Sequence, residues 1–317
     1  ASDSILGFAS LLVLTSDGTR NLITRARAFL NGKFIDGITP TEISQDKFKE
    51  AFIHEFGHFS GLDHSQINVE VLSASQRTTD NLAGLPNMFP FLLSTAPARP
   101  SLAPDDIAAI SELYPDPSFA STTGRIRGQI FFSDGTTPAQ GFNVIARQVD
   151  NMVTPENESK RIAVSSVSGF KFTACAGNPV AGDCGSISTR GSRDQTLIGL
   201  YDIPGLPPGS YTVEVEAINP QFTGGSAVGP IGRVGFQFPL PGPPEFHSGA
   251  DETGSSATDP PSSSFAITVS AGANIPDINI ILNDTPPRFD AWETVWLQFR
   301  VGILAARMDR RFAWSEL

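Results

Sequence analysis

Residues 54–64 read HEFGHFSGLDH and contain three of the four histidines in this 317-residue chain, His54, His58 and His64. On a helix, side chains four positions apart lie on one face, so His54 and His58 can bind one ion from the same side. Gly61 can adopt a positive φ and end the helix, after which the chain can turn back and bring His64 to the same ion. The stretch therefore predicts a helix and a tight turn around a metal site with three imidazole ligands.

Zinc is the metal that this ligand set favours, because imidazole nitrogen is one of its usual protein ligands. Three protein ligands leave a fourth position for water, and zinc lowers the pKa of such a water from about 15.7 to about 7. Glu55 directly follows the first ligand and is placed to take the proton of that water and pass it to a leaving amine. The alternatives are a structural zinc site and a chance cluster of histidines on an amphipathic helix. Closed structural sites favour four ligands and cysteine, and no cysteine lies near this stretch.

The whole pattern, HExxHxxGxxH, resembles the zinc signature of the metzincin metallopeptidases, and Ser65 after it is similar to the matrixin branch. Metzincins have a methionine-containing turn beneath the metal, and Met88 in LPNMFPFL would supply it. The stretch LAPDDIAAISELYP, residues 102–115, resembles the last helix of a matrixin catalytic domain. The resemblance implies a zinc endopeptidase with one catalytic zinc ion. Calcium is a second candidate cofactor, for which the sequence offers no binding motif.

The sequence departs from the matrixin pattern in three respects. Met88 follows His64 by 24 residues, so residues 66–84 are expected to form an inserted loop near the cleft, on which substrate preference could depend. No histidine remains near the site for the second, structural zinc ion that matrixins often bind. Only 53 residues precede His54, so the catalytic domain is expected to be partial at its N-terminus, in a chain that is a processed form or a fragment.

Patterning around the histidines predicts the local secondary structure. Ser44 is a good N-cap for the helix that carries the histidines. Residues 22–32 alternate as in a strand, which by the resemblance is the sheet edge that pairs with substrate, and residues 5–10 would flank the metal. The side chains expected to pack on the inner side of the histidine helix are Phe48, Ala51, Phe52, Phe56 and Phe59.

In the helix expected within residues 102–115, Asp105 and Asp106 favour the positive end of the helix dipole. Its expected apolar face consists of Ile107, Ile110, Leu113 and Tyr114.

Helical patterning stops near residue 115, and short alternating strands follow. GRIRGQIFFSDGTTPAQGFNVIARQV predicts two strands around an Asp-Gly turn, and YTVEVEA, FAITVSA and DINIILN predict further strands. Parts of this region resemble the carboxypeptidase regulatory-like, transthyretin-like domain, which implies a β-sandwich that serves as a spacer or an adhesion module. Its core would contain Tyr211, Val213 and Val215, and His247 would lie in a surface loop.

The predicted fold class is thus an α+β metzincin-like catalytic domain, N-terminally short, followed by an all-β sandwich domain. The domain boundaries are 1–116 for the peptidase domain, 117–123 for a linker and 124–285 for the sandwich with its long loop insertions. Residues 286–317 are a tail of unknown role, whose apolar runs are too short to span a bilayer.

Cys175 and Cys184 are the two cysteines, nine residues apart across a Gly- and Pro-containing segment. Two interpretations stand: a small disulfide loop formed in an oxidising compartment, or a pair of free thiols.

The composition indicates a secreted, modular protein. Gly and Pro are abundant, Lys and Arg are few, and a net charge of −11 argues against nucleic-acid binding. We expect an extracellular enzyme that acts on proteins or peptides, has no transmembrane span, and reaches a cell-surface or matrix ligand through the sandwich. The alternative from another class is an extracellular adhesion or matrix-binding protein whose zinc domain is vestigial or truncated.

Overall fold

The computed structural model describes residues 6–16, 21–38, 42–93, 96–99, 101–139, 141–169, 198–219 and 245–285. Within these residues the fold is a mixed α+β structure in which sheets predominate. The two cysteines, Cys175 and Cys184, and the tail 286–317 lie outside the described residues. None of the described helices is both long and apolar enough to cross a membrane.

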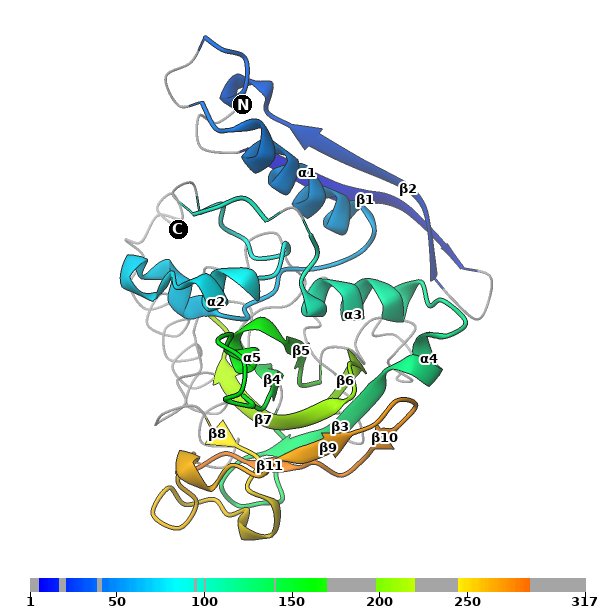
Figure 1. Ribbon diagram of the computed structural model, residues 1–317. Helices are drawn as coiled ribbons and strands as arrows, with labels where there is room; N and C mark the ends of the chain where they lie inside the picture. The colour runs from blue at the N-terminus through cyan, green and yellow to red at the C-terminus, as the bar shows by residue number, and fades with distance from the viewer. Residues whose placement is uncertain are drawn as a thin grey trace, which may run out of the picture.

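Three layers follow one another through the molecule (Figure 1). A two-stranded hairpin and helix α1 lie at one end, and a β-sandwich lies at the other. Between them lie α3 and the short helices of the segment that follows α1. The segments predicted as a peptidase unit and a sandwich therefore pack directly against each other.

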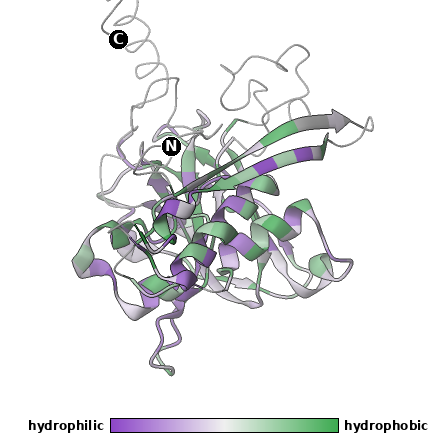
Figure 2. Ribbon diagram, turned by 90° about the horizontal axis from the view of Figure 1, so that it is seen from above, coloured by the Kyte–Doolittle hydropathy of each residue, from purple (hydrophilic) through white to green (hydrophobic). Residues whose placement is uncertain are grey.

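The hairpin pairs β1 (Gly7–Ser16) with β2 (Asn21–Leu30) in antiparallel register, and a short 3-10 helix, Gly32–Phe34, follows it. Polar and apolar residues are mixed along both strands (Figure 2). Helix α1 (Gln45–Phe59) packs on the hairpin, and the Ser44 side chain accepts a hydrogen bond from the Lys47 N–H as the predicted N-cap.

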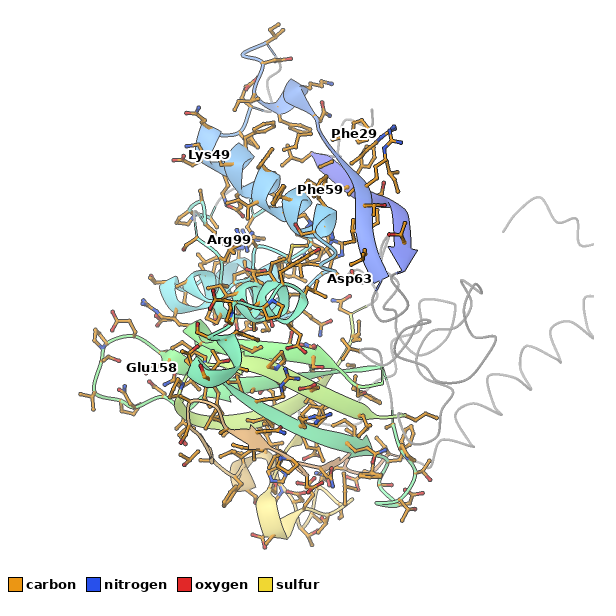
Figure 3. The ribbon with its side chains drawn as sticks, turned by 90° about the vertical axis from the view of Figure 1, so that its right-hand side faces the viewer. Phe29, Lys49, Phe59, Asp63, Arg99 and Glu158 are labelled. Carbon is orange, nitrogen blue, oxygen red and sulfur yellow. The ribbon has the colours of Figure 1, made fainter. Side chains whose placement is uncertain are left out.

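The prediction for the inner face of α1 is wrong at two positions. Phe52 and Phe56 are each 53% exposed and stack on each other at the surface, whereas the fully buried side chains of the helix include Glu50 and Glu55. Glu50 can be buried because Arg99 donates to its carboxylate through Nε at 2.8 Å and through its backbone N–H at 3.1 Å. Arg99 lies beneath α1 on the side of the sandwich (Figure 3). The hydrophobic pattern could not show that a buried arginine would pair with this face.

Residues 66–84, expected to be a loop near the cleft, instead pack against the sandwich. The segment contains two 3-10 helices and α2, with bounds Val69–Leu72, Ala74–Gln76 and Thr79–Ala83. Ile67 is fully buried with Ile145 and Ala163 of the sandwich. Glu70 and Asp80 form ion pairs of 2.6 Å with Lys160 and Arg161 in the sandwich helix α5 (Glu158–Arg161).

Helix α3 (Pro104–Leu113) forms where it was predicted, but its buried face differs from the expected one. Ile107, Leu113 and Tyr114 are about half exposed, whereas Asp105, Asp106 and Ala108 are buried. Ala108 belongs to the core of the sandwich, so the face of α3 that packs inward is set by contact with β5 and β6. Helix α4 (Phe119–Thr122) occupies most of the segment predicted as a linker.

The sandwich consists of two sheets. The first has the order β10-β3-β11 with β6 also paired to β3, and the second has the order β5-β4-β7-β8 with β9 paired to β7. The strand bounds are β3 Gly124–Phe131, β4 Phe142–Gln148, β5 Ala163–Val167, β6 Leu200–Leu206, β7 Gly209–Ala217, β8 Glu245–Phe246, β9 Ile267–Val269, β10 Asn274–Ile275 and β11 Ile280–Ile281. Two short 3-10 helices, Gly249–Asp251 and Pro261–Ser263, complete the second half.

The sandwich core confirms the predicted positions of Tyr211, Val213 and Val215, all of which are fully buried. Strands β3 and β4 flank the Asp-Gly turn as predicted, but they belong to different sheets. Strand β5 lies in a region predicted as a loop insertion, because its sequence AVSSV alternates too weakly to be recognised.

The prediction of a surface position for His247 is wrong. The side chain is 8% exposed, its Nδ1 lies 2.7 Å from the Asn279 carbonyl oxygen, and its ring packs edge-on against Phe265. A lone histidine in a Pro- and Gly-rich segment carries no periodicity that could have indicated this burial.

The interface between the layers also contains a titratable group. Burial raises the pKa of Glu216 in β7 to about 7, against hydrogen bonds from Asn143 and Gln66 that lower it. A carboxyl group whose pKa is higher in the folded chain stabilises the fold below its unfolded pKa and loses that contribution as pH rises through about 7.

We therefore expect that Glu216→Gln removes one pH-dependent part of the free energy of unfolding. Between about pH 5 and about pH 8, the wild-type protein should lose stability relative to this variant, measured as the urea midpoint at each pH. Glu42→Gln, at an exposed carboxylate, is the matched control and should follow the wild-type pH dependence. Parallel curves for Glu216→Gln and wild type would contradict the assignment.

Candidate metal centre

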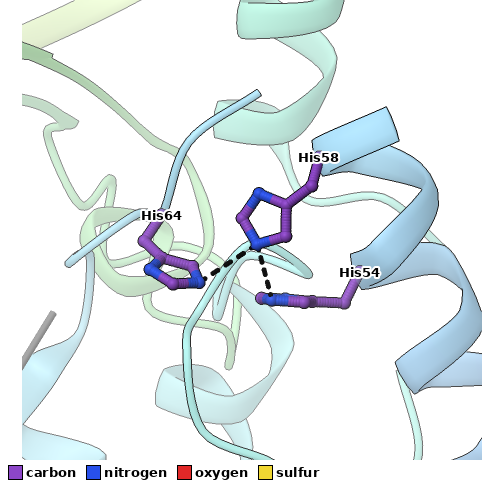
Figure 4. Close-up of side chains that lie close together, drawn as sticks. All are labelled: His54, His58 and His64. Atoms are coloured by element: carbon purple, nitrogen blue, oxygen red, sulfur yellow. Dashed lines mark hydrogen bonds between the residues drawn. The ribbon is translucent and has the colours of Figure 1, made fainter. Parts of the chain in front are cut away.

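The three histidines predicted as ligands come together in space. Helix α1 presents His54 and His58 on one face, and the chain turns at Gly61, whose φ is +98°, before His64. The Nε2 atom of His58 lies 3.1 Å from the Nε2 atoms of both His54 and His64 (Figure 4). One ligand atom of each histidine lies within 4.8 Å of the others, and no further Cys, Asp, Glu or His among the described residues joins this group.

The other ring nitrogens show which tautomer two of the imidazoles adopt. His54 Nδ1 lies 2.7 Å from the Asn87 carbonyl oxygen, and His58 Nδ1 lies 2.9 Å from the Leu62 carbonyl oxygen. A carbonyl oxygen can only accept, so Nδ1 carries the proton and donates it, which leaves a lone pair on Nε2 in the neutral ring. Burial, the largest cause, lowers the pKa of His54 to about 3 and favours this neutral form.

Two of the three nitrogen–nitrogen distances, those from His58 Nε2, are close to the spacing of ligands around a zinc ion, and the third pair of ligand atoms lies within 4.8 Å. Two Nε2 lone pairs that face each other at 3.1 Å repel unless a cation lies between them. Zinc–nitrogen bonds of about 2.0–2.1 Å at tetrahedral angles separate neighbouring ligand atoms by about 3.3 Å, which is close to the observed spacing. The backbone carbonyls that accept from Nδ1 orient the rings as outer-shell partners do in zinc proteins. Three ligands leave one position of a tetrahedral site open.

Glu55 is buried next to this site. It is 6% exposed, and its Oε2 atom has no hydrogen-bond partner within the described residues. The carboxylate packs against strand β1, where a Cβ built on Gly7 would lie 2.8 Å from Glu55 Oε1. Burial raises the pKa of Glu55 to about 7. Such a carboxyl group can accept and release a proton near neutral pH, as general acid–base chemistry requires.

Met88, predicted to lie in a turn beneath the metal, packs against the histidine helix. It is 3% exposed, and a Cβ built on Gly57, which lies on α1 between the two histidine positions, would be 2.2 Å from Met88 Sδ. The backbone of the turn is also tied to the site, because the Ser65 N–H donates to the Met88 carbonyl at 3.0 Å. The methionine turn thus contacts both α1 and the segment that follows the third histidine.

Sequence reasoning did not find the residue that holds this turn in place. The Asp106 carboxylate accepts hydrogen bonds from the backbone N–H groups of Asn87 at 2.7 Å, Met88 at 3.0 Å and Ala103 at 3.0 Å. Asp106 was predicted only to favour the dipole of its own helix. The sequence shows only that Asp106 belongs to an acidic pair at the start of α3. That position does not indicate which backbone N–H groups donate to its carboxylate.

Strand β1, and not the strand predicted as the sheet edge, lies against the Glu55 carboxylate. Residues 22–32 do form β2, but it is Gly7 of β1 that contacts Glu55. That residues 5–10 flank a bound metal stays a prediction.

Comparison with known proteins yields little. No protein-family model matches the chain, and no curated protein matches it. One solved structure with partial similarity is the crystal structure of BcpA, the major pilin subunit of Bacillus cereus. The similarity covers 52% of this chain and 31% of that chain at 12% sequence identity, with a TM-score of 0.22. A similarity of this size supports no conclusion about the fold or the function.

The close packing of Gly57 against Met88 generates a testable prediction. Replacing glycine by alanine within a helix usually stabilises the helix by about 1 kcal/mol. Here the added methyl group would collide with the buried Met88 sulfur, so Gly57→Ala should instead destabilise the protein by about 1–3 kcal/mol in urea unfolding.

The double variant Gly57→Ala/Met88→Ala separates this collision from other effects. Removing the sulfur should make the alanine at 57 less costly in the Met88→Ala background than in the wild type, as a double-mutant cycle measures. Gly32→Ala is the control, since a Cβ at Gly32 meets nothing within 4 Å. Equal costs of Gly57→Ala in both backgrounds would show that Met88 does not pack there.

Proposed function

We propose that this chain is a secreted zinc-dependent endopeptidase of the matrixin-like metzincin type, with a β-sandwich accessory module. The observation that carries the proposal is the convergence of three Nε2 atoms, two of them on rings whose Nδ1 groups donate to backbone carbonyls. The pattern HExxHxxGxxH and the supporting turn at Met88 agree with it. The proposed substrates are proteins or peptides outside the cell.

His54, His58 and His64 would hold the ion, and zinc would supply a Lewis acid that polarises a carbonyl and lowers the pKa of water. Glu55 would accept the proton of the attacking water at its unpartnered Oε2 atom. The same carboxyl group would then donate that proton to the departing amine, so that one residue serves as base and as acid.

Strand β1 is the part of the proposed cleft that lies beside Glu55. Its pairing with β2 uses one of its two edges, and among the described strands no other pairs with it. An extended peptide can add to such an edge through main-chain hydrogen bonds, which bind a substrate with little dependence on its sequence. The Gly7 position brings this strand into direct contact with the catalytic carboxylate.

Glu55→Gln tests the assigned base. The variant keeps the size of the side chain and all three imidazoles, so metal content measured by elemental analysis should stay at about one zinc ion per chain. Peptide hydrolysis should fall by about 10²–10⁴-fold, because the amide cannot accept the proton of water. Cleavage of a casein-type substrate by the metal-loaded protein provides the measurement, with Glu42→Gln as an exposed carboxylate control that should retain full activity.

Two results would contradict the proposal in different ways. Full turnover by Glu55→Gln would remove Glu55 as the base while leaving a metal enzyme in place. A wild-type protein that cleaves nothing, and that adheres to a surface or matrix equally well after chelation, would favour the adhesion protein with a vestigial zinc domain.

A further inference from the structure

Three of the four residues after His64 contact the sandwich. We call residues 65–68 the His64 arm. Its first residue bonds to the methionine turn, as described above, and the next three contact β4, β5, β7 or α5 of the sandwich. His54 and His58 lie on one helix, whereas His64 lies in the segment that continues directly into this arm.

Gln66 makes the most specific of these contacts. Its Nε2 donates to the Glu216 carboxylate at 2.7 Å and to the Ala217 carbonyl at 2.9 Å, and its Oε1 accepts from the Asn219 N–H at 2.6 Å. Both ends of the amide are therefore used by the end of β7, and the side chain is only 7% exposed. Asn143 in β4 donates to the same Glu216 oxygen at 2.8 Å and holds the acceptor in place.

Asn68 fixes the far end of the arm. It adopts the left-handed conformation with φ of 58°, which non-glycine residues seldom adopt without compensating contacts. Its side chain supplies these contacts: Oδ1 accepts from Arg147 at 2.9 Å, and Nδ2 donates to the Lys160 carbonyl at 2.8 Å. Together with the burial of Ile67, these bonds leave the arm little freedom to shift.

Ser65 connects the arm to a third element. Burial, the larger effect, raises the pKa of the Asp105 carboxyl at the start of α3, and the Ser65 side chain lowers that pKa. The same carboxylate accepts from the backbone N–H of Ser165 in β5 at 2.7 Å and from its hydroxyl at 3.1 Å. A sandwich strand is thus joined to the residue next to His64 through one buried carboxylate.

We propose that the β-sandwich positions His64 for metal binding through the His64 arm, with Gln66 as a positioning residue. The inference rests on the proposed zinc function. A ligand that is not held in place must be ordered when the ion binds, and that ordering costs free energy which a fixed ligand avoids. The sandwich is therefore part of the metal centre, and the competing explanation is that the bond between Ser65 and the methionine turn holds His64 by itself.

The test compares metal binding by the full chain carrying Gln66→Ala with the wild type. Zinc affinity is measured by competition with a chromophoric chelator, and cobalt(II) replaces zinc to report coordination by visible absorption. The variant should bind zinc about 10–100-fold more weakly, the size of effect seen when outer-shell partners of zinc ligands are removed. Its cobalt spectrum should lose intensity, because an ion held by His54 and His58 without His64 takes additional water.

Glu216→Ala provides a second variant that leaves the arm unchanged and removes its acceptor on the sandwich. It should shift affinity and spectrum in the same direction. Gln129→Ala is the matched control, since Gln129 in β3 donates to the Ile198 carbonyl at 2.7 Å and is not among the contacts of the arm. This control should lose stability without any change in zinc affinity or in the cobalt spectrum.

The outcomes separate the inference from the function on which it rests. Wild-type protein that binds neither zinc nor cobalt would overturn the proposed function and this inference together. Wild-type protein that binds the ion, with folded Gln66→Ala and Glu216→Ala proteins that bind it equally well and give the same spectrum, would overturn the inference alone. Circular dichroism establishes folding for each variant before metal is added.

Discussion

The carboxylate of Asp106 is the contact on which the candidate metal centre depends. It accepts three backbone hydrogen bonds from two segments, Asn87–Met88 and Ala103, and so fixes the methionine turn relative to α3. The methionine turn also provides the Asn87 carbonyl oxygen, which accepts a hydrogen bond from His54 Nδ1. Hydrogen bonds to a charged acceptor each contribute about 1.5–3 kcal/mol, and removing a buried partner of this kind leaves the N–H groups unpaired. Burial raises the pKa of Asp106, and the three bonds oppose that effect.

The three ligands are thus positioned by interactions of increasing range. His54 and His58 are brought together by helix periodicity alone, over four residues. His64 reaches them through the turn at Gly61, which is also local. In the proposed arrangement the contacts that hold His64 are not local, because the arm that follows it contacts sandwich residues about 80–150 positions away in sequence. Under this proposal, the complete site forms only when the sandwich and the helical layer pack together.

The difference between local and distant interactions explains which predictions succeeded. The N-cap Ser44, the positive φ of Gly61 and the placement of three imidazoles around one point follow from short-range rules, and the structure confirms them. Alternation likewise predicted the core positions of β7, because a strand with one buried face must place every second side chain inward. A metzincin fold and zinc binding remain proposals, because neither the structure nor the comparisons test them.

The failures share a cause as well. The buried faces of α1 and α3 contain Glu50, Asp105 and Asp106, which a hydrophobic pattern assigns to solvent. Each of these carboxylates meets a partner from a distant segment, such as Arg99 or the Ser165 backbone. A prediction from amphipathic patterning assumes that the core is apolar. It therefore places such carboxylates in solvent and predicts that Phe52 or Ile107 is buried instead. The prediction of a loop at residues 66–84 failed for the same reason. The residues that this segment contacts lie in the sandwich, and the sequence of the segment does not show which residues those are.

Glu55 is the exception that favours a function over a structural role. The other buried carboxylates discussed above accept hydrogen bonds, which offset part of the free-energy cost of their desolvation. Oε2 of Glu55, in contrast, has no partner within the described residues. A buried polar atom without a hydrogen bond costs about 1–3 kcal/mol, and the protein would be more stable with an apolar side chain there. Sequences break such local rules mainly at functional sites. In the proposed zinc enzyme, the unpartnered Oε2 atom of Glu55 would be the free acceptor that water activation requires.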